Sequence, residues 1–404
     1  MEGIRILEVA EHTFVPAASG ILADWGAEVV KIEHVQRGDA MRGLGQTGTT
    51  GFSTSVPVLM EHSNRGKKSL GLDLAHPDGL AILHQLIARS DVFLTNKLPK
   101  VLKKLHIEVD DVRAHNPNIV YVRGTGYGIH GPDADAGGYD FLGYWARAGS
   151  ASAVRPHEVE APPVPPSPAY GDSIGAMTIA GGIAAALLHR ERTGEAHVVD
   201  VSLLGIGMWA MGGAIAISQL SQEPWAQFPL GTRGTPSNPI VGMYRTKDGR
   251  FVALSMLQGF HYWPDMCRRM DREHLIDDPR FATAELLMQN AQEAAALVAE
   301  AFEERTQAEW VERLTGMPGQ WSLVQDTVQV ADDVQVVANG YLQEVQTADG
   351  TPFKLVSAPV QFDEEASVVR RGPEFNEHGD AILTEELGMD WDTVIDLKLK
   401  GVVA

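Results

Sequence analysis

IRILEV (residues 4–9) and AEVVKIE (residues 27–33) are two apolar runs that flank a segment with helical spacing, from Ala17 to Trp25. A strand, a helix and a second strand in this order form a βαβ unit, whose two strands are parallel. The alternation continues outward, with helix 77–89 before strand 92–95 and helix 109–114 before strand 119–123. The sequence therefore predicts an α/β fold with a Rossmann-like, doubly wound sheet.

Two segments rich in proline divide the rest of the chain. Prolines between residues 156 and 168 predict an extended connection that leads into a packed helix, 174–190, and a strand, 197–203. The second such segment, 224–239, precedes a hairpin pattern centred on Asp248-Gly249 and helices between residues 282 and 314. We expect a large α/β domain over residues 1–223, a smaller α+β domain over 224–323, and a C-terminal part, 324–404, that returns to the large domain.

The composition excludes several partners. The chain has 404 residues and 33 Lys plus Arg against 53 Asp plus Glu, a net charge of -20, which repels nucleic acid and anionic membranes. The lone Cys267 permits no internal disulfide, and no signal-peptide pattern precedes residue 4, so we expect a cytoplasmic protein. The uncharged stretch 202–220 could span a membrane, but its length and composition favour a buried helix.

Metal and dinucleotide sites find little support. The 14 histidines lack paired spacing and the cysteine has no partner, so no metal is expected. GxGxxG occurs at residues 43–48 and 126–131, in neither place between a strand and a helix, although the second remains a plausible ligand loop. GxSxG at residues 171–175 would make Ser173 a hydrolase nucleophile, but the proline-rich approach cannot be the buried strand that such an elbow needs.

Asp172 precedes an apolar helix and has two interpretations. As an N-cap it would contribute about 0.5–2 kcal/mol to stability. As a functional carboxylate at a helix N-terminus it would stay ionised at neutral pH, while Gly171 and Gly175 would leave room for a bulky ligand.

A lysine-rich window covers residues 96–104, with four lysines and no acidic residue. It is either a solvated helix face or a seat for phosphates. A second basic cluster, Arg65, Lys67 and Lys68, favours the phosphate site.

Taken together, six segments in their order along the chain resemble the class III CoA-transferase family, which also contains the α-methylacyl-CoA racemases. The resemblance covers nearly the whole chain, and it implies an obligate, interlocked homodimer. The segments are residues 3–9, 22–33, 64–70, 126–128, 171–172 and 244–249.

The resemblance implies that coenzyme A moves from an acyl-CoA thioester to a carboxylic acid acceptor, with Asp172 as the covalent nucleophile. Coenzyme A is then a substrate, and no permanently bound cofactor is expected. A glycine-rich loop at 231–234 is a candidate oxyanion site. The resemblance places the coenzyme A contacts at His34, Leu72, Asn96, Lys97, Lys104, Thr125, Tyr127 and Tyr139.

Departures from the family pattern narrow the range of substrates and reactions expected of the chain. Thr13, His34 and Thr125 replace residues of the oxalyl- and formyl-specific transferases and argue against those substrates. A racemase needs two bases, but Tyr139 and Gln258 stand at their places, and neither is a good base near neutral pH. The alternatives are therefore racemase-type proton transfer and a non-catalytic acyl-CoA-binding protein in which Asp172 only caps a helix.

Overall fold

The computed structural model describes residues 1–404 apart from 48–54, 157, 226–234 and 236. The chain forms two compact units. The larger consists of Met1–Arg155, Ala161–Trp225 and Val334–Ala404, and the smaller of Pro156–Glu160 and Ala226–Asp333. The domain limits drawn from the sequence, at 223/224 and 323/324, stay a prediction.

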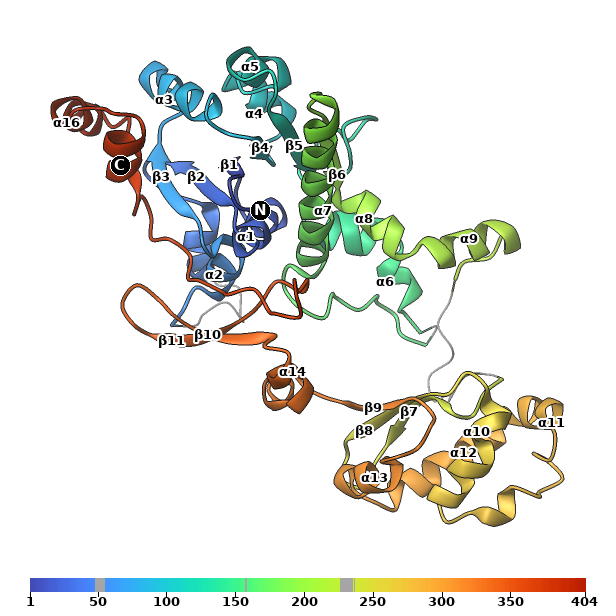
Figure 1. Cartoon of the computed structure of the whole chain (residues 1–404). Coiled ribbons are helices and arrows are strands. Elements are labelled where there is room, and N and C mark those ends of the chain that lie inside the picture. Colours follow the sequence, from blue (N-terminus) through green and yellow to red (C-terminus); the bar gives the residue numbers. More distant parts are fainter. Residues whose placement is uncertain (48–54, 157, 226–234, 236) are drawn as a thin grey trace. The chain divides into compact units, whose positions relative to one another are not determined.

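A parallel six-stranded sheet forms the centre of the larger unit (Figure 1). Its strand order is β3-β2-β1-β4-β5-β6, so the order reverses between β1 and β4. In open sheets of this kind, ligands bind beyond the carboxyl ends of the strands at such a reversal. The strands are β1 (Arg5–Val9), β2 (Glu28–His34), β3 (Lys68–Leu72), β4 (Val92–Thr95), β5 (Val120–Thr125) and β6 (Val198–Ser202).

Alternate residues of these strands serve two separate cores, because successive side chains point to opposite faces of a sheet. Ile6 and its neighbours on one face pack against α1 (Phe14–Asp24) and α7 (Tyr170–Thr193). Leu7 and its neighbours on the other face pack against α3 (Pro77–Ile87) and α5 (Val109–His115). The α/β fold class and the parallel sheet predicted from the sequence are thus confirmed.

Shorter elements complete the larger unit. Near the sheet lie η1 (Ala40–Thr47), α2 (Val58–Asn64), α4 (Pro99–Lys104), the π-helix η2 (Phe141–Arg147) and α6 (Ser150–Ala153). The C-terminal part contributes α14 (Val334–Ala338), the antiparallel pair β10 (Leu342–Gln346) and β11 (Pro352–Val356), α15 (Gly379–Ala381), η5 (Ile382–Glu386) and α16 (Trp391–Leu399).

The stretch 202–220 is not the buried helix predicted from its composition. It forms α8 (Leu203–Ala210) and α9 (Gly212–Ser221), which are bent by 70° relative to each other. None of the residues of α9 is buried, and Trp209 and Leu220 are each 88% exposed. By length and composition α7 could also cross a membrane, but half of its apolar window is buried inside the protein.

The smaller unit packs helices on an antiparallel sheet, β7 (Val241–Arg245), β8 (Phe251–Ser255) and β9 (Trp321–Val324). The predicted hairpin is confirmed, because β7 pairs with β8 and Gly249 takes φ 78° in the turn between them. Trp263, Phe302 and Trp310 form the centre of its core. The helices are α10 (Gly259–Arg269), η3 (Glu273–Leu275), α11 (Ala284–Gln289), α12 (Ala291–Glu303), α13 (Gln307–Leu314) and η4 (Gln329–Asp332).

Candidate active site

Asp172 lies in the first turn of α7 and is 9% exposed. The residue at the N-cap position is Ala169, in a left-handed conformation and without a side-chain cap. The interpretation of Asp172 as the N-cap is therefore wrong. Within the described part of the chain, no hydrogen bond reaches its carboxylate, and Asp172 contributes to the lining of a cavity.

The glycines beside Asp172 allow close packing, not the approach of a ligand that their position suggested. A Cβ on Gly171 would lie 2.5 Å from Cγ of Tyr144. A Cβ on Gly175 would lie 2.5 Å from the ring of Phe14. The two aromatic rings fill this space and fix the start of α7 against its neighbours.

The electrostatic surroundings of Asp172 differ from those expected of a helix N-terminus. Burial, and to a smaller extent the neighbouring charge of Asp140, together raise the pKa of the Asp172 carboxyl from 3.8 to about 7. Asp140 is held at this place because its Oδ1 accepts the N–H of Phe141 at 2.7 Å and its Oδ2 accepts the N–H of Gly171 at 3.2 Å. Asp172 therefore titrates near neutral pH and is not fully ionised there.

A cavity of about 440 Å³ lies in front of Asp172. Residues just beyond β1, β4 and β5 line it, so it lies at the carboxyl ends of the strands where the strand order reverses. Phe14, Leu142 and Leu203 make part of its wall apolar. The predicted residues Asn96, Lys97, Thr125 and Tyr139 belong to this lining together with Asp172.

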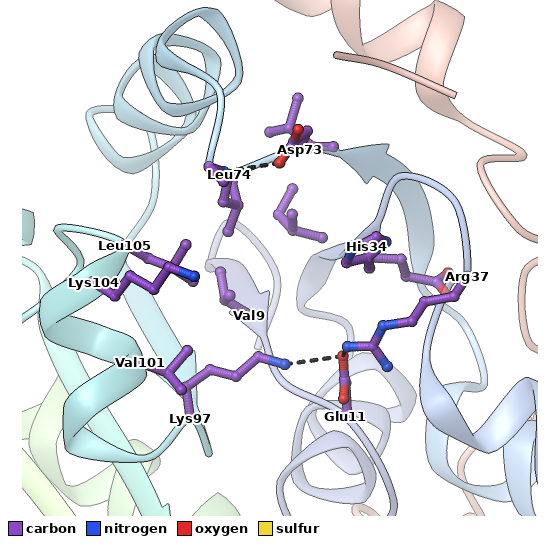
Figure 2. A pocket seen from close by; sticks show the side chains of 14 residues that line it. Val9, Glu11, His34, Arg37, Asp73, Leu74, Lys97, Val101, Lys104 and Leu105 are labelled. Carbon is purple, nitrogen blue, oxygen red and sulfur yellow. Dashed lines mark hydrogen bonds and ion pairs between the residues drawn. The ribbon is translucent and has the colours of Figure 1, made fainter. Parts of the chain in front are cut away.

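A second cavity, of about 260 Å³, lies over the carboxyl ends of β1, β2 and β3 (Figure 2). It contains the predicted residues His34, Leu72 and Lys104, and it shares Lys97 with the first cavity. Figure 2 shows Lys97 and Arg37 pointing toward Glu11, whose carboxylate pairs with Lys97 at 3.0 Å and with Arg37 at 2.8 Å. The two neighbouring cavities therefore form one site. One end is lined by Arg37, Lys97 and Lys104 together with the carboxylates of Glu11, Glu33 and Asp73, and the other end contains the buried carboxylate of Asp172.

One predicted residue lies outside both cavities. Tyr127 packs under Arg147, whose guanidinium carbon lies 4.8 Å from the ring centroid. Arg147 also pairs with Asp133 at 2.5 Å, so it holds the 126–138 loop in place. The loop itself reaches the cavity through Gly126 and Gly138, whose backbones are in contact.

The second basic cluster is not a phosphate seat. Lys67 is fully enclosed and pairs with Glu8 at 2.7 Å, and Arg65 pairs with Asp24 at 3.0 Å. Lys68 pairs with Glu28 at 2.9 Å and with Glu386 at 2.8 Å. All three cations are neutralised by carboxylates of the larger unit, so they support the fold. The candidate oxyanion loop at 231–234 and Gly48 of the first GxGxxG lie outside the described residues.

Two residues of the site were missed from the sequence. Arg37 lines the second cavity, and the only signal for it was a basic residue shortly after the end of β2. His12 lines the cavity of Asp172, and its ring meets that of Tyr139 edge to face, with centroids 5.5 Å apart. A lone histidine before a helix does not indicate from the sequence that the residue lines a cavity. The arrangement places a buried carboxylate at a partly apolar cavity, next to a second cavity that His34, Leu72 and Lys104 line.

The chain is similar to known proteins in sequence and in fold. The sequence profile described as CoA-transferase family III matches residues 1–379. The chain is 30% identical to (R)-2-hydroxy-4-methylpentanoate CoA-transferase of Clostridioides difficile, over 100% of this chain and 99% of that protein. It is 30% identical to cinnamoyl-CoA:phenyllactate CoA-transferase of Clostridium sporogenes, over 93% of this chain and 89% of that protein.

The fold has a solved counterpart in Rv3272 of Mycobacterium tuberculosis, with a TM-score of 0.78 and 28% identity over 94% of this chain and 98% of that one. The match of profile, full-length relatives and fold leads to one conclusion: the chain belongs to CoA-transferase family III.

Proposed function

We propose that this enzyme transfers coenzyme A from an acyl-CoA thioester to a free carboxylic acid, and that Asp172 carries the covalent intermediates. The observation that carries the proposal is a buried carboxylate without a hydrogen-bond partner among the described residues, at the wall of a cavity next to a recess that Lys104 lines. Poor solvation makes a carboxylate a stronger nucleophile once it has lost its proton.

The chemistry divides into acyl transfers that need no external acid or base. An Asp172 oxygen attacks the thioester carbonyl and the C–S bond breaks. The thiolate of coenzyme A is expelled, and a mixed anhydride of the acyl group and Asp172 remains. The thiolate then attacks the Asp172 carbonyl. The first carboxylate is released, and Asp172 becomes an aspartyl-CoA thioester. The acceptor carboxylate attacks that thioester, and the thiolate finally returns to the acceptor's carbonyl and frees Asp172.

The coenzyme A moiety belongs in the recess over β1, β2 and β3. Lys104 supplies positive charge there in a chain with a net charge of -20, whereas Arg37 is paired with Glu11. His34 and Leu72 line the walls. The acyl group belongs in the cavity of Asp172, where Phe14, Leu142 and Leu203 suit an apolar acid. Two relatives are named for 4-methyl-branched and aromatic 2-hydroxy acids, which supports acids of this kind as substrates.

The quaternary state and location are part of the same proposal. The Rossmann-like larger unit leaves Trp209 and Leu220 each 88% exposed on α8 and α9, which is unusual for a protein that stays monomeric in water. The exposed residues and the family resemblance together support an interlocked homodimer that covers this surface. The acidic charge and the nature of the substrates favour a cytoplasmic enzyme that binds neither nucleic acid nor membranes.

The direct test is exchange of thioesters in solution. The purified chain is incubated with a panel of acyl-CoA donors and free branched or aromatic acids, and new acyl-CoA species are separated by chromatography. We expect a new thioester to form with the wild type and not with Asp172→Asn. Exchange of the α-hydrogen for deuterium without formation of a new thioester would instead support the racemase alternative.

A further inference from the structure

Most polar side chains of the Asp172 cavity are already engaged. Asn96 uses its amide oxygen and nitrogen on the backbone of Glu11, at 3.1 Å and 2.6 Å. Thr125 accepts the N–H of Gly128 at 3.0 Å, and Lys97 is paired with Glu11. These contacts fix the walls of the cavity, and the charge of Lys97 is balanced by that of Glu11.

His12 is different. It is half-buried, lines the same cavity as Asp172, and has no hydrogen bond to either ring nitrogen within the described part of the chain. Its ring meets that of Tyr139 edge to face. A neutral imidazole carries one N–H donor and a protonated one carries two, so His12 can donate to an oxygen in the cavity.

The backbone of His12 is held in an uncommon conformation by buried charges. Its φ is 69°, in the left-handed region that residues with a Cβ rarely adopt. The N–H of His12 is donated to Asp39 Oδ1 at 3.1 Å, and Asp39 Oδ2 pairs with Lys31 at 2.7 Å. Lys31 also donates to the carbonyl oxygen of Ala10 at 2.9 Å, so one enclosed ion pair holds the turn on both sides of Glu11.

We propose that His12 binds the carboxylate of the acid substrate, with Asp39 and Lys31 as positioning residues for its backbone. The inference rests on the proposed function. It follows because the acid enters after Asp172 has become an uncharged thioester, and the cavity's one lysine in the described lining, Lys97, is already paired. An anion that enters this cavity needs a free donor, and His12 supplies one.

In that step the carboxylate oxygen held by His12 attacks the carbonyl carbon of the aspartyl-CoA thioester. A C–O bond forms, the C–S bond breaks and the thiolate leaves, with no proton gained or lost. The same contact receives the carboxylate that departs in the first half of the cycle. His12 therefore sets the affinity for the free acid and not the affinity for coenzyme A.

The experiment compares His12→Ala and His12→Asn with the wild type. The KM for the free acid, the KM for acyl-CoA, and acylation of Asp172 by mass spectrometry are measured for each. His12→Ala should raise the KM for the acid about tenfold or more, the loss expected for one hydrogen bond to a charged group. The KM for acyl-CoA should stay within about twofold, and His12→Asn, which keeps a donor, should recover most of the loss.

His106→Ala is the matched control, because His106 is an exposed histidine outside both cavities that also takes a positive φ, 51°. It should leave both KM values unchanged. An unaltered KM for the acid in His12→Ala, with Asp172 still acylated, overturns the inference and leaves the proposed function intact. Failure of the wild type to acylate Asp172 with donors that bind overturns the proposed function itself.

Discussion

The carboxylate of Asp140 raises the pKa of the nearby Asp172, in addition to the larger effect of burial, because its Oδ2 is fixed 3.2 Å from the N–H of Gly171 at the start of α7. One acidic residue thus delays the ionisation of the other. Together with burial, this relationship sets the pH range in which the proposed nucleophile is active.

Asp140→Asn should move the acidic limb of the pH–rate profile to lower pH. Asp172 attacks as a carboxylate, so kcat/KM for acyl-CoA should rise with pH through the pKa of about 7 in the wild type. Without the neighbouring charge the pKa falls, although burial keeps it above its usual value of 3.8. The profile between pH 5 and 9 is the measurement, with the exposed Asp135→Asn as control; a limb that stays in place would contradict the electrostatic role of Asp140.

Asp172→Asn should stabilise the folded chain at high pH. Because the folded pKa is raised, the wild-type carboxyl contributes stability below about pH 4 and loses it as the pH rises to about 7, up to roughly 4 kcal/mol in total. The variant should therefore unfold at a higher temperature than the wild type at pH 8, with the difference shrinking toward pH 4. Thermal unfolding at both pH values tests this, and Asp277→Asn on the surface of the smaller unit should show no such dependence.

Gly171→Ala should disrupt the first turn of α7. Its new Cβ would lie 2.5 Å from Cγ of Tyr144, so the turn or the ring must shift, at about 1–3 kcal/mol in the free energy of unfolding, and transfer activity should fall steeply. Gly181→Ala in the same helix has nothing within 4 Å of its Cβ and should be neutral or stabilise by about 0.5–1 kcal/mol. Equal effects of the two substitutions in denaturant melts would contradict the packing argument.

Lys104→Ala should weaken the binding of acyl-CoA. Loss of one solvent-exposed ion pair between Lys104 and coenzyme A should weaken binding by about 1 kcal/mol. The KM for acyl-CoA should therefore rise about fivefold, and the rise should be smaller at high salt. The KM for the free acid should not change. Lys100→Ala is the control, because Lys100 is exposed on the same helix, α4, and lines neither cavity; an equal effect of both would mean that only the general charge of the helix matters.

Leu220→Glu should weaken self-association. Leu220 is 88% exposed on α9, and a charge there would be buried in the proposed homodimer. Sedimentation analysis should show a larger monomer fraction for this variant than for Leu399→Glu, which changes an 82% exposed leucine on α16. A wild-type chain that sediments as a monomer at all concentrations would refute the dimer.

Much of the fold follows from local sequence pattern. The strand predicted at residues 92–95 is β4, and the helix expected at 174–190 is the central part of α7, because buried strands and packed helices have continuous apolar signatures. The same reasoning wrongly predicts a buried helix over residues 202–220, because apolar composition does not distinguish a helix buried in its own chain from an exposed one. The bend between α8 and α9 falls at Met211, directly before Gly212 and Gly213, and two consecutive glycines are a local signal for a break in a helix that overall apolar composition does not reveal.

The site was only partly predictable. Asp172, His34 and Lys104 were found through a family resemblance, and the structure places them at two neighbouring cavities. Lys67 looked equally suited to a phosphate, but its partner Glu8 is 59 residues away in the chain, so only the fold reveals that its charge is neutralised. His12 could not be found at all, because its role depends on a backbone held by Asp39 from another loop.

The covalent intermediate on Asp172 is the central claim, and mass spectrometry tests it most directly. The protein is incubated with a panel of acyl-CoA thioesters and hydroxylamine beside an Asp172→Ala control, and both the intact mass and the peptide that contains residue 172 are analysed. We predict a hydroxamate on Asp172 that the control lacks. An unmodified Asp172 with every thioester that binds would contradict the mechanism.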